Sequence, residues 1–138
     1  MRKLILILSL IVIVTLSPNV VMSETLKFLD LVERDGLYYQ KFSDVPFTGK
    51  LTGEVNGSFK DGKMVGLWVM YHGNGRLSFK GKYKDGKEEG PFVTYHYNGG
   101  LHYRGTYKDG KQIGPYIEYD KRGQLRYKGT YKNGVKVK

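Results

Sequence analysis

The chain contains no cysteine among its 138 residues. A disulfide, a lipid attached to cysteine and a cysteine nucleophile are therefore all excluded. If the protein is exported, its fold depends on packing and hydrogen bonds alone. The length allows one small domain.

A hydrophobic run long enough to span a membrane is also lacking. The apolar run at residues 4–16 has 13 residues, whereas a membrane-spanning helix needs about 20. It follows Arg2 and Lys3 and is followed by small residues at 21–23. This order is typical of a secretory signal peptide, residues 1–23, cleaved after Ser23. We therefore expect a secreted or periplasmic protein without a transmembrane span in the mature chain; an uncleaved N-terminal membrane anchor is the alternative.

Acidic residues are scarce. The chain has 23 Lys and Arg against 13 Asp and Glu, a formal net charge of +10, and loss of residues 1–23 would leave +8. Basic exported proteins meet anionic lipids, wall polymers or acidic proteins more often than nucleic acid. We expect an unknown protein partner or an anionic envelope polymer or lipid, and no nucleic acid.

Catalytic motifs are missing as well. There is no Gly-x-Ser-x-Gly elbow, and no Walker-type lysine and serine follow Gly73-Asn74-Gly75. Asp61, Asp85 and Asp109 recur, but each precedes a glycine, where an Asp side chain bonds the local backbone. We expect a protein that is not an enzyme, with no catalytic residues and no cofactor.

Histidines give only a weak metal-site signal. His72 and His96 occupy one column of the repeat described below, and His102 lies nearby in the sequence. Asp120 takes the third place in that column, and no further ligand is evident. We expect surface histidines and no metal site.

Glycine, in contrast, is abundant and periodic. Three segments of 24 residues, 57–80, 81–104 and 105–128, align without a gap, and a partial fourth covers 129–138. Residues 24–56 precede them as a degenerate repeat or cap. Four columns hold 14 of the 19 glycines: Gly57, Gly81, Gly105 and Gly129; Gly62, Gly86, Gly110 and Gly134; Gly66, Gly90 and Gly114; Gly75, Gly99 and Gly123.

Each repeat carries two turn signals. One is Asp-Gly, as at Asp61-Gly62, with Asn133-Gly134 in the last copy. The other is Asn-Gly, as at Asn74-Gly75, with Arg122-Gly123 as a weaker version in the third repeat. Both dipeptides tolerate the positive φ angles of tight hairpin turns. Two turns per repeat predict two strands per repeat, hence an all-β protein: an elongated, twisted, repetitive antiparallel β-meander of about eight strands in which each repeat contacts its neighbours.

The second strand of each repeat, such as residues 77–84, alternates between apolar or glycine and polar residues. This period predicts Leu, aromatic, Gly and aromatic side chains on one face, where rings cover the glycine, and a basic row on the other. The first strand is less regular, because Trp68 and Tyr71 stand three residues apart. Either a bulge restores one face or both faces are partly covered.

Two sets of residues are candidate binding sites. The basic row either follows a polyanion or forms a solvated face: Lys60, Lys80, Lys84, Arg104, Lys108, Lys128 and Lys132. The most conspicuous aromatic residues of the first strands, Trp68, Phe92 and Tyr116, either line a groove or belong to the core.

Glycine-aromatic columns with Asn/Asp-Gly-Lys-x-x-Gly turns resemble the MORN repeat variant, as found in YwqK-type toxin–antitoxin antitoxins. The pre-repeat segments 31–39 and 46–49 resemble that family too, and the likeness covers residues 26–138. The resemblance implies a repetitive β-sheet. It adds an antitoxin or immunity-like protein that neutralises a cognate toxin as the alternative to a binding or scaffold protein.

Overall fold

The protein is seen in a computed structural model that describes residues 25–137. The expected signal peptide, residues 1–23, and its cleavage site lie outside the described residues. One turn of 3-10 helix, η1 (Phe28–Asp30), interrupts the strands. The strands are β1 (Thr25–Leu26), β2 (Leu31–Arg34), β3 (Leu37–Gln40), β4 (Gly49–Leu51), β5 (Val55–Lys60), β6 (Lys63–Tyr71), β7 (Leu77–Lys84), β8 (Lys87–Glu88), β9 (Gly90–Tyr95), β10 (Leu101–Lys108), β11 (Lys111–Tyr119), β12 (Leu125–Lys132) and β13 (Val135–Val137).

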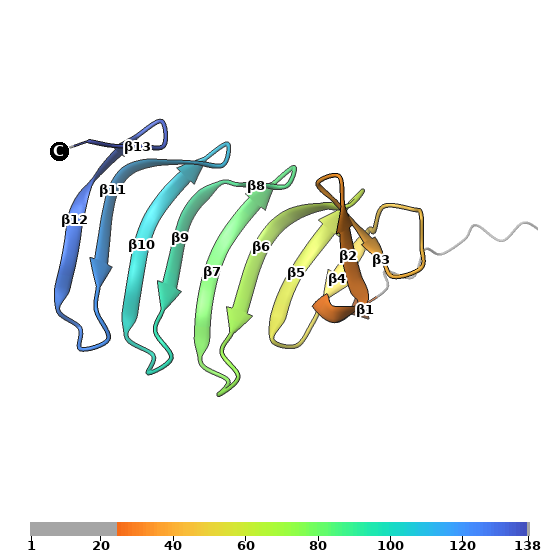
Figure 1. The fold of residues 1–138 in the computed structure, drawn as a ribbon, viewed down its shortest axis with the longest axis horizontal. Coiled ribbons are helices and arrows are strands. Elements are labelled where there is room, and N and C mark those ends of the chain that lie inside the picture. The colour runs from red at the N-terminus through yellow and green to blue at the C-terminus, as the bar shows by residue number, and fades with distance from the viewer. Residues whose placement is uncertain (1–24, 138) are drawn as a thin grey trace, which may run out of the picture.

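Most strands form one long sheet. Its order is β1-β4-β5-β6-β7-β9-β10-β11-β12-β13, and β8 pairs with β7. From β4 onward successive strands are antiparallel neighbours, while β1 runs parallel to β4. Figure 1 shows this meander laid out along the long axis of the molecule. The prediction of an elongated all-β meander with two strands per repeat is confirmed.

The Asp-Gly turns have the predicted backbone. Asp61 and Gly62 both have positive φ angles, 51° and 75°, and the corresponding pairs of later repeats do the same. In the Asn-Gly turns only the glycine is positive, as at Gly75 with 79°. There the Gly75 N–H donates to the His72 carbonyl, and His72 N–H to the Arg76 carbonyl. The second turn is therefore a longer loop than the first.

A bulge interrupts the first strand of the repeats. Between β10 and β11 the paired residues jump from Arg104 opposite Ile117 to Thr106 opposite Ile113, so three residues of β11 oppose one of β10. Gly114 sits in this bulge with a φ of 68°. Pro115 therefore lies inside β11 and not at its start, at an irregular place that tolerates a proline without an N–H.

Aromatic rings cover glycines on one face, called here the inner face. Trp68 is fully buried, and a Cβ placed on Gly57 would lie only 2.3 Å from its indole. Tyr116 covers Gly129 in the same way, with a closest approach of 2.8 Å. The prediction that rings occupy the space left by these glycines is confirmed, and the structure shows that first-strand rings do most of it.

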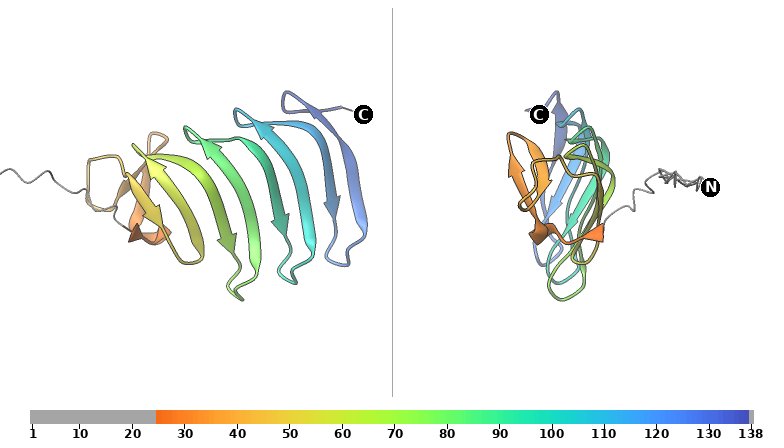
Figure 2. Two further views of the ribbon diagram at one scale, coloured as in Figure 1. Left: turned by 180° about the vertical axis from the view of Figure 1, so that it is seen from behind. Right: turned by 90° about the vertical axis from the view of Figure 1, so that its right-hand side faces the viewer.

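The inner face is covered at one end only. The β2–β3 pair packs there, with the Tyr38 ring 4.9 Å from Phe59, and Leu31 and Phe47 join Trp68 in the buried core. Figure 2 shows β2 and β3 on one side of the main sheet. Farther along, the inner face carries half-buried rings that stack on one another, including Phe92 on Tyr103 at 5.2 Å.

The leucines that begin the second strand of each repeat do not lie on the inner face. Between β9 and β10 the register shifts so that Leu101 opposes Tyr95, whereas Tyr103 opposes Thr94. The shift recurs at Leu77 and Leu125. Residues directly opposed in an antiparallel ladder share a face, so the leucines lie with the tyrosines at the end of the outer face. The prediction of leucine on the aromatic face was wrong, because this second irregularity, separate from the first-strand bulge, adds one residue to the second strand and reverses the alternation.

Candidate binding surface on the outer face

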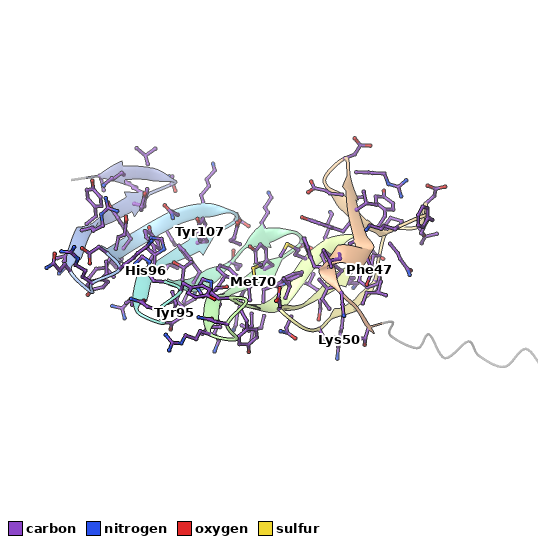
Figure 3. All side chains as sticks on the ribbon, turned by 60° about the horizontal axis from the view of Figure 1, so that its bottom comes forward. Phe47, Lys50, Met70, Tyr95, His96 and Tyr107 are labelled. Carbon is purple, nitrogen blue, oxygen red and sulfur yellow. The ribbon has the colours of Figure 1, made fainter. Side chains whose placement is uncertain are left out.

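The face opposite Trp68, called here the outer face, carries the predicted basic row. Side chains alternate between the two faces of a strand, and Trp68 opposes Gly81, so Lys80 and Lys84 point away from the core. Figure 3 shows Phe47 and Tyr107 on the inner side of the sheet and Lys50 and Tyr95 on the other. The same alternation places all seven predicted residues outside: Lys60, Lys80, Lys84, Arg104, Lys108, Lys128 and Lys132.

Three of these residues belong to one row that runs across the strands. Lys80 opposes Val69 on one side and Val93 on the other, and Arg104 opposes Val93 and Ile117. The basic side chains are exposed and the apolar ones half-buried. We call this the transverse row; in strand order it consists of Val69, Lys80, Val93, Arg104, Ile117 and Lys128.

The other four basic residues stand beside the Asp-Gly turns or, in the case of Lys132, beside the equivalent Asn133-Gly134 turn. Lys84 opposes Lys87, and the pairs Lys60–Lys63 and Lys108–Lys111 repeat the arrangement. Lys132 opposes Val135 instead. The turn lysines Lys63, Lys87 and Lys111 therefore lie on the outer face as well, because a two-residue turn places the flanking residues directly opposite each other.

Two shallow hollows lie along the transverse row. The first has a volume of about 400 Å³, and its lining includes Leu67, Val93, Tyr95, Lys80 and Arg104. The second has a volume of about 420 Å³ and lies one repeat farther on, between Pro91, Pro115, Ile117, Arg104 and Lys128. Each hollow therefore has an apolar floor and basic side chains around it. Such a site suits a ligand that is both anionic and partly apolar.

The three proposed groove residues do not share one groove. Trp68, 0% exposed, lies in the core, whereas Tyr116, 4% exposed, borders the second hollow and Phe92 borders the first. Phe92 is half-buried, with its ring 4.5 Å from Tyr107 on the inner face. These residues were candidates because a sequence cannot show which face of the first strand is covered. The structure places their rings on the inner face, and Tyr95 of the same strand as Phe92 points outward.

The histidines connect neighbouring repeats. His72 Nε2 lies 3.0 Å from the Tyr95 carbonyl oxygen, and His96 Nε2 lies 2.9 Å from that of Tyr119. Both are half-buried, so they are not the free surface histidines we expected. The rings of His96 and His102 are 4.4 Å apart. Within residues 25–137, no group of three or more His, Asp or Glu side chains is arranged to hold a metal ion.

Electrostatically the two faces differ. On the inner face, burial followed by the Glu88 charge raises the pKa of Tyr83 to about 12. Burial also raises the pKa of Tyr103 and Tyr107, so these inner-face hydroxyl groups stay uncharged at neutral pH. On the outer face the transverse row contains bases and no acid. Glu89, which directly precedes β9, accepts the Asp109 N–H of the neighbouring Asp-Gly turn at 2.9 Å.

The sequence reasoning missed the apolar members of the transverse row. Val69, Val93 and Ile117 follow Trp68, Phe92 and Tyr116 by one residue and recur with the same spacing. That column was visible in the sequence as a β-branched position. Its place beside the basic residues depends on the pairing between strands, which the sequence does not show.

Comparisons with known proteins concern the repeats. Residues 64–85, 88–109 and 112–133 each match the MORN repeat variant. No curated protein sequence matches the chain. Among solved structures, one of accessory secretory protein 1,2 and 3 in Streptococcus pneumoniae is similar over 81% of this chain, with 14% identity and a TM-score of 0.36. This chain spans 20% of that one. In the part of the chain that is described, no helix has the length and apolar character needed to cross a bilayer.

Proposed function

We propose that this MORN-like repeat protein is an exported, non-enzymatic binding protein whose outer face engages an anionic envelope surface or polymer. The transverse row is the observation that supports this best. Exposed basic side chains at Lys80, Arg104 and Lys128 alternate there with half-buried β-branched residues across six adjacent strands. The row thus offers charge and apolar contact at a regular spacing.

The spacing favours an extended ligand. Neighbouring strands are about 4.8 Å apart, so basic side chains of the row recur about every 10 Å. This distance is close to the Debye length of about 8–10 Å at physiological salt. A small anion would therefore be attracted by only one of these charges at a time, whereas a polymer or a charged surface would interact with all of them.

The lysine pairs at the turns support the same function. Like charges directly opposite each other in a sheet are destabilising, by tenths of a kcal/mol up to about 1 kcal/mol. Lys60–Lys63, Lys84–Lys87 and Lys108–Lys111 nevertheless recur, and all lie on the outer face. The turn aspartates offset part of this repulsion. A surface that retains such pairs suits a partner that supplies negative charge.

We propose that residues 24–56 are a cap and residues 57–138 the repeat domain. The packing of the β2–β3 pair over Phe59 on the inner face supports this division. A cap at one end of a repeat sheet shields the core that no further repeat covers. It leaves the outer face free for binding.

The experiment compares two triple variants in binding to vesicles of phosphatidylglycerol and phosphatidylcholine. Replacing Lys80, Arg104 and Lys128 by Gln should weaken binding at least about tenfold at low salt, because the row loses its charge. The control set, Arg76, Lys121 and Arg122 to Gln, removes the same charge from the Asn-Gly turns and their equivalent. It should weaken binding much less.

Salt provides the second readout. Binding of the unaltered protein should fall steeply as salt rises, and vesicles of phosphatidylcholine alone should bind poorly. Affinity that ignores salt, or equal losses from the two variants, would contradict the proposal. The alternative implied by the YwqK-type resemblance, neutralisation of a cognate toxin, would then be preferred. In that case a protein partner would bind the face without this dependence on anionic lipid.

A further inference from the structure

The loop between β3 and β4 presents an unusual residue. Phe42 is fully exposed, at 107%, and its φ angle is +65°. The Ser43 N–H donates to the Gln40 carbonyl at 3.1 Å, so Phe42 is the third residue of a β-turn. A positive φ at that place is usual for glycine or asparagine. A bulky side chain there is strained and has no contact in the fold that would compensate.

Arg34 holds this loop in place. Its Nη1 lies 2.9 Å from Asp44 Oδ1, its Nη2 donates to the Ser43 carbonyl, and its guanidinium stacks on the Tyr39 ring at 4.0 Å. The Val45 N–H also donates to the Ser43 hydroxyl at 3.1 Å. The loop is thus ordered before any partner arrives, which is the property that makes an apolar side chain an effective anchor. We call Phe42, Asp44 and Val45 the knob.

The knob and the first hollow are complementary. Val45 is 72% exposed beside Phe42, and the Asp44 side chain is 98% exposed. The hollow offers Leu67 and Val93 as an apolar floor, with basic side chains around it. The segments that carry the two surfaces have net charges of opposite sign. Residues 28–45 contain four acidic and two basic residues, and residues 57–138 contain seven acidic and 17 basic ones.

We propose that the knob of one molecule docks into the outer-face hollow of a second copy, so that Phe42 fills the apolar floor and Asp44 meets Lys80 and Arg104. The loop between β3 and β4, which carries the knob, lies at one end of the sheet, as Figure 1 shows. The hollow lies several strands away on the face opposite the cap. A molecule therefore cannot fill its own hollow, and the contact is head-to-face. Such a contact uses two different surfaces and extends into an open series of copies.

The experiment follows the size of the full chain by sedimentation velocity over a range of concentrations. The unaltered protein should form a series that grows beyond the dimer. Phe42→Gly removes the anchor, and Lys80→Glu with Arg104→Glu reverses the charge around the hollow. Each variant alone should remain monomeric. A 1:1 mixture of the two should form a dimer and nothing larger, because only one intact knob and one intact hollow remain per pair.

Two further measurements separate docking from folding. Phe42→Gly relieves the positive φ and should leave the melting temperature unchanged or raise it, while association is lost. Leu29→Ser, which removes another exposed apolar side chain of the cap, should leave association intact. Vesicle binding should survive Phe42→Gly, so failure of this contact is distinguishable from failure of the proposed function. A protein that stays monomeric at all concentrations, or a mixture that forms no dimer, would overturn the proposal.

Discussion

At the scale of single residues, the core depends on glycines that lie beneath aromatic rings. Gly57 has no Cβ at the place that the Trp68 indole occupies, and Gly129 likewise has none where the Tyr116 ring packs. The glycines of this column thus serve packing, while Gly62 and its equivalents serve turns that need a positive φ. One residue type therefore recurs in the repeat for two different physical reasons.

Gly57→Ala should destabilise the fold by roughly 1–3 kcal/mol, the usual cost of overpacking a core. The added methyl would stand 2.3 Å from the Trp68 indole, which is fully buried and has little room to move. Gly73→Ala is the matched control, because its Cβ would meet nothing within 4 Å and its φ is not positive. Urea unfolding measures both. Equal stabilities of the two variants would show that the indole moves aside freely.

At the scale of strands and turns, neighbouring repeats are joined by side chains as well as by the backbone ladder. The second turn of each repeat reaches the next one: His72 to the Tyr95 carbonyl, Asn74 Nδ2 to the Tyr97 carbonyl, and Asn98 Nδ2 to the Lys121 carbonyl. These contacts fix the spacing of the loops. They explain why histidine and asparagine recur in the repeat without any metal or catalytic role being required.

His96→Ala should reduce stability by about 0.5–1.5 kcal/mol through loss of one hydrogen bond, with the lost ring packing adding to it. The bond joins His96 Nε2 to the Tyr119 carbonyl of the next repeat, 2.9 Å away. Lys121→Ala is the control, since its backbone carbonyl accepts from Asn98 Nδ2 whatever the side chain is, and the side chain itself is exposed. Thermal unfolding compares them. A His96 variant as stable as the control would mean that the bond adds nothing beyond what water provides.

At the scale of the whole molecule, the protein is a single bent sheet with a cap over one end. Its inner face is lined with tyrosines whose hydroxyl groups are held uncharged. Burial raises the pKa of Tyr38, Tyr83, Tyr103 and Tyr107, and Tyr83 reaches about 12. These rings lie in both the cap and the repeats, so their ionisation should destabilise the whole fold and not one part of it.

Alkaline pH should therefore unfold the protein. The folded-state pKa of Tyr83, about 12, lies above the unfolded value of 10.0. Its contribution to stability is fully present below pH 10 and is lost as the pH rises toward 12. Circular dichroism and tyrosinate absorbance should change together in this window.

Tyr83→Phe should shift that alkaline transition to higher pH, because one ionisable hydroxyl leaves the inner face. Tyr97→Phe, at a position 63% exposed, should not shift it. If tyrosinate forms well below the loss of structure, the inner-face rings ionise without unfolding and their burial does not control stability. A rise in the free energy of unfolding between pH 10 and 12 would contradict the predicted direction.

The sequence by itself determined the repeat, its turns and its pairing of glycine with rings. These features are local and periodic: Asp61-Gly62 specifies a tight turn within a few residues, and the 24-residue spacing repeats it. Alternation within β7 was enough to place Lys80 and Lys84 on the face away from the core. The same rules located the basic row before any partner strand was known.

Only the tertiary structure decided which residues meet across strands. A one-residue bulge moved Leu101 to the outer face, and the register between repeats placed Val93 between Lys80 and Arg104. Trp68 was assigned to the core by the cap and by Gly57 on a neighbouring strand. These relations join residues far apart in the chain. A register can change by one residue with little change in local sequence preference, and each such change reverses the face of every side chain beyond it.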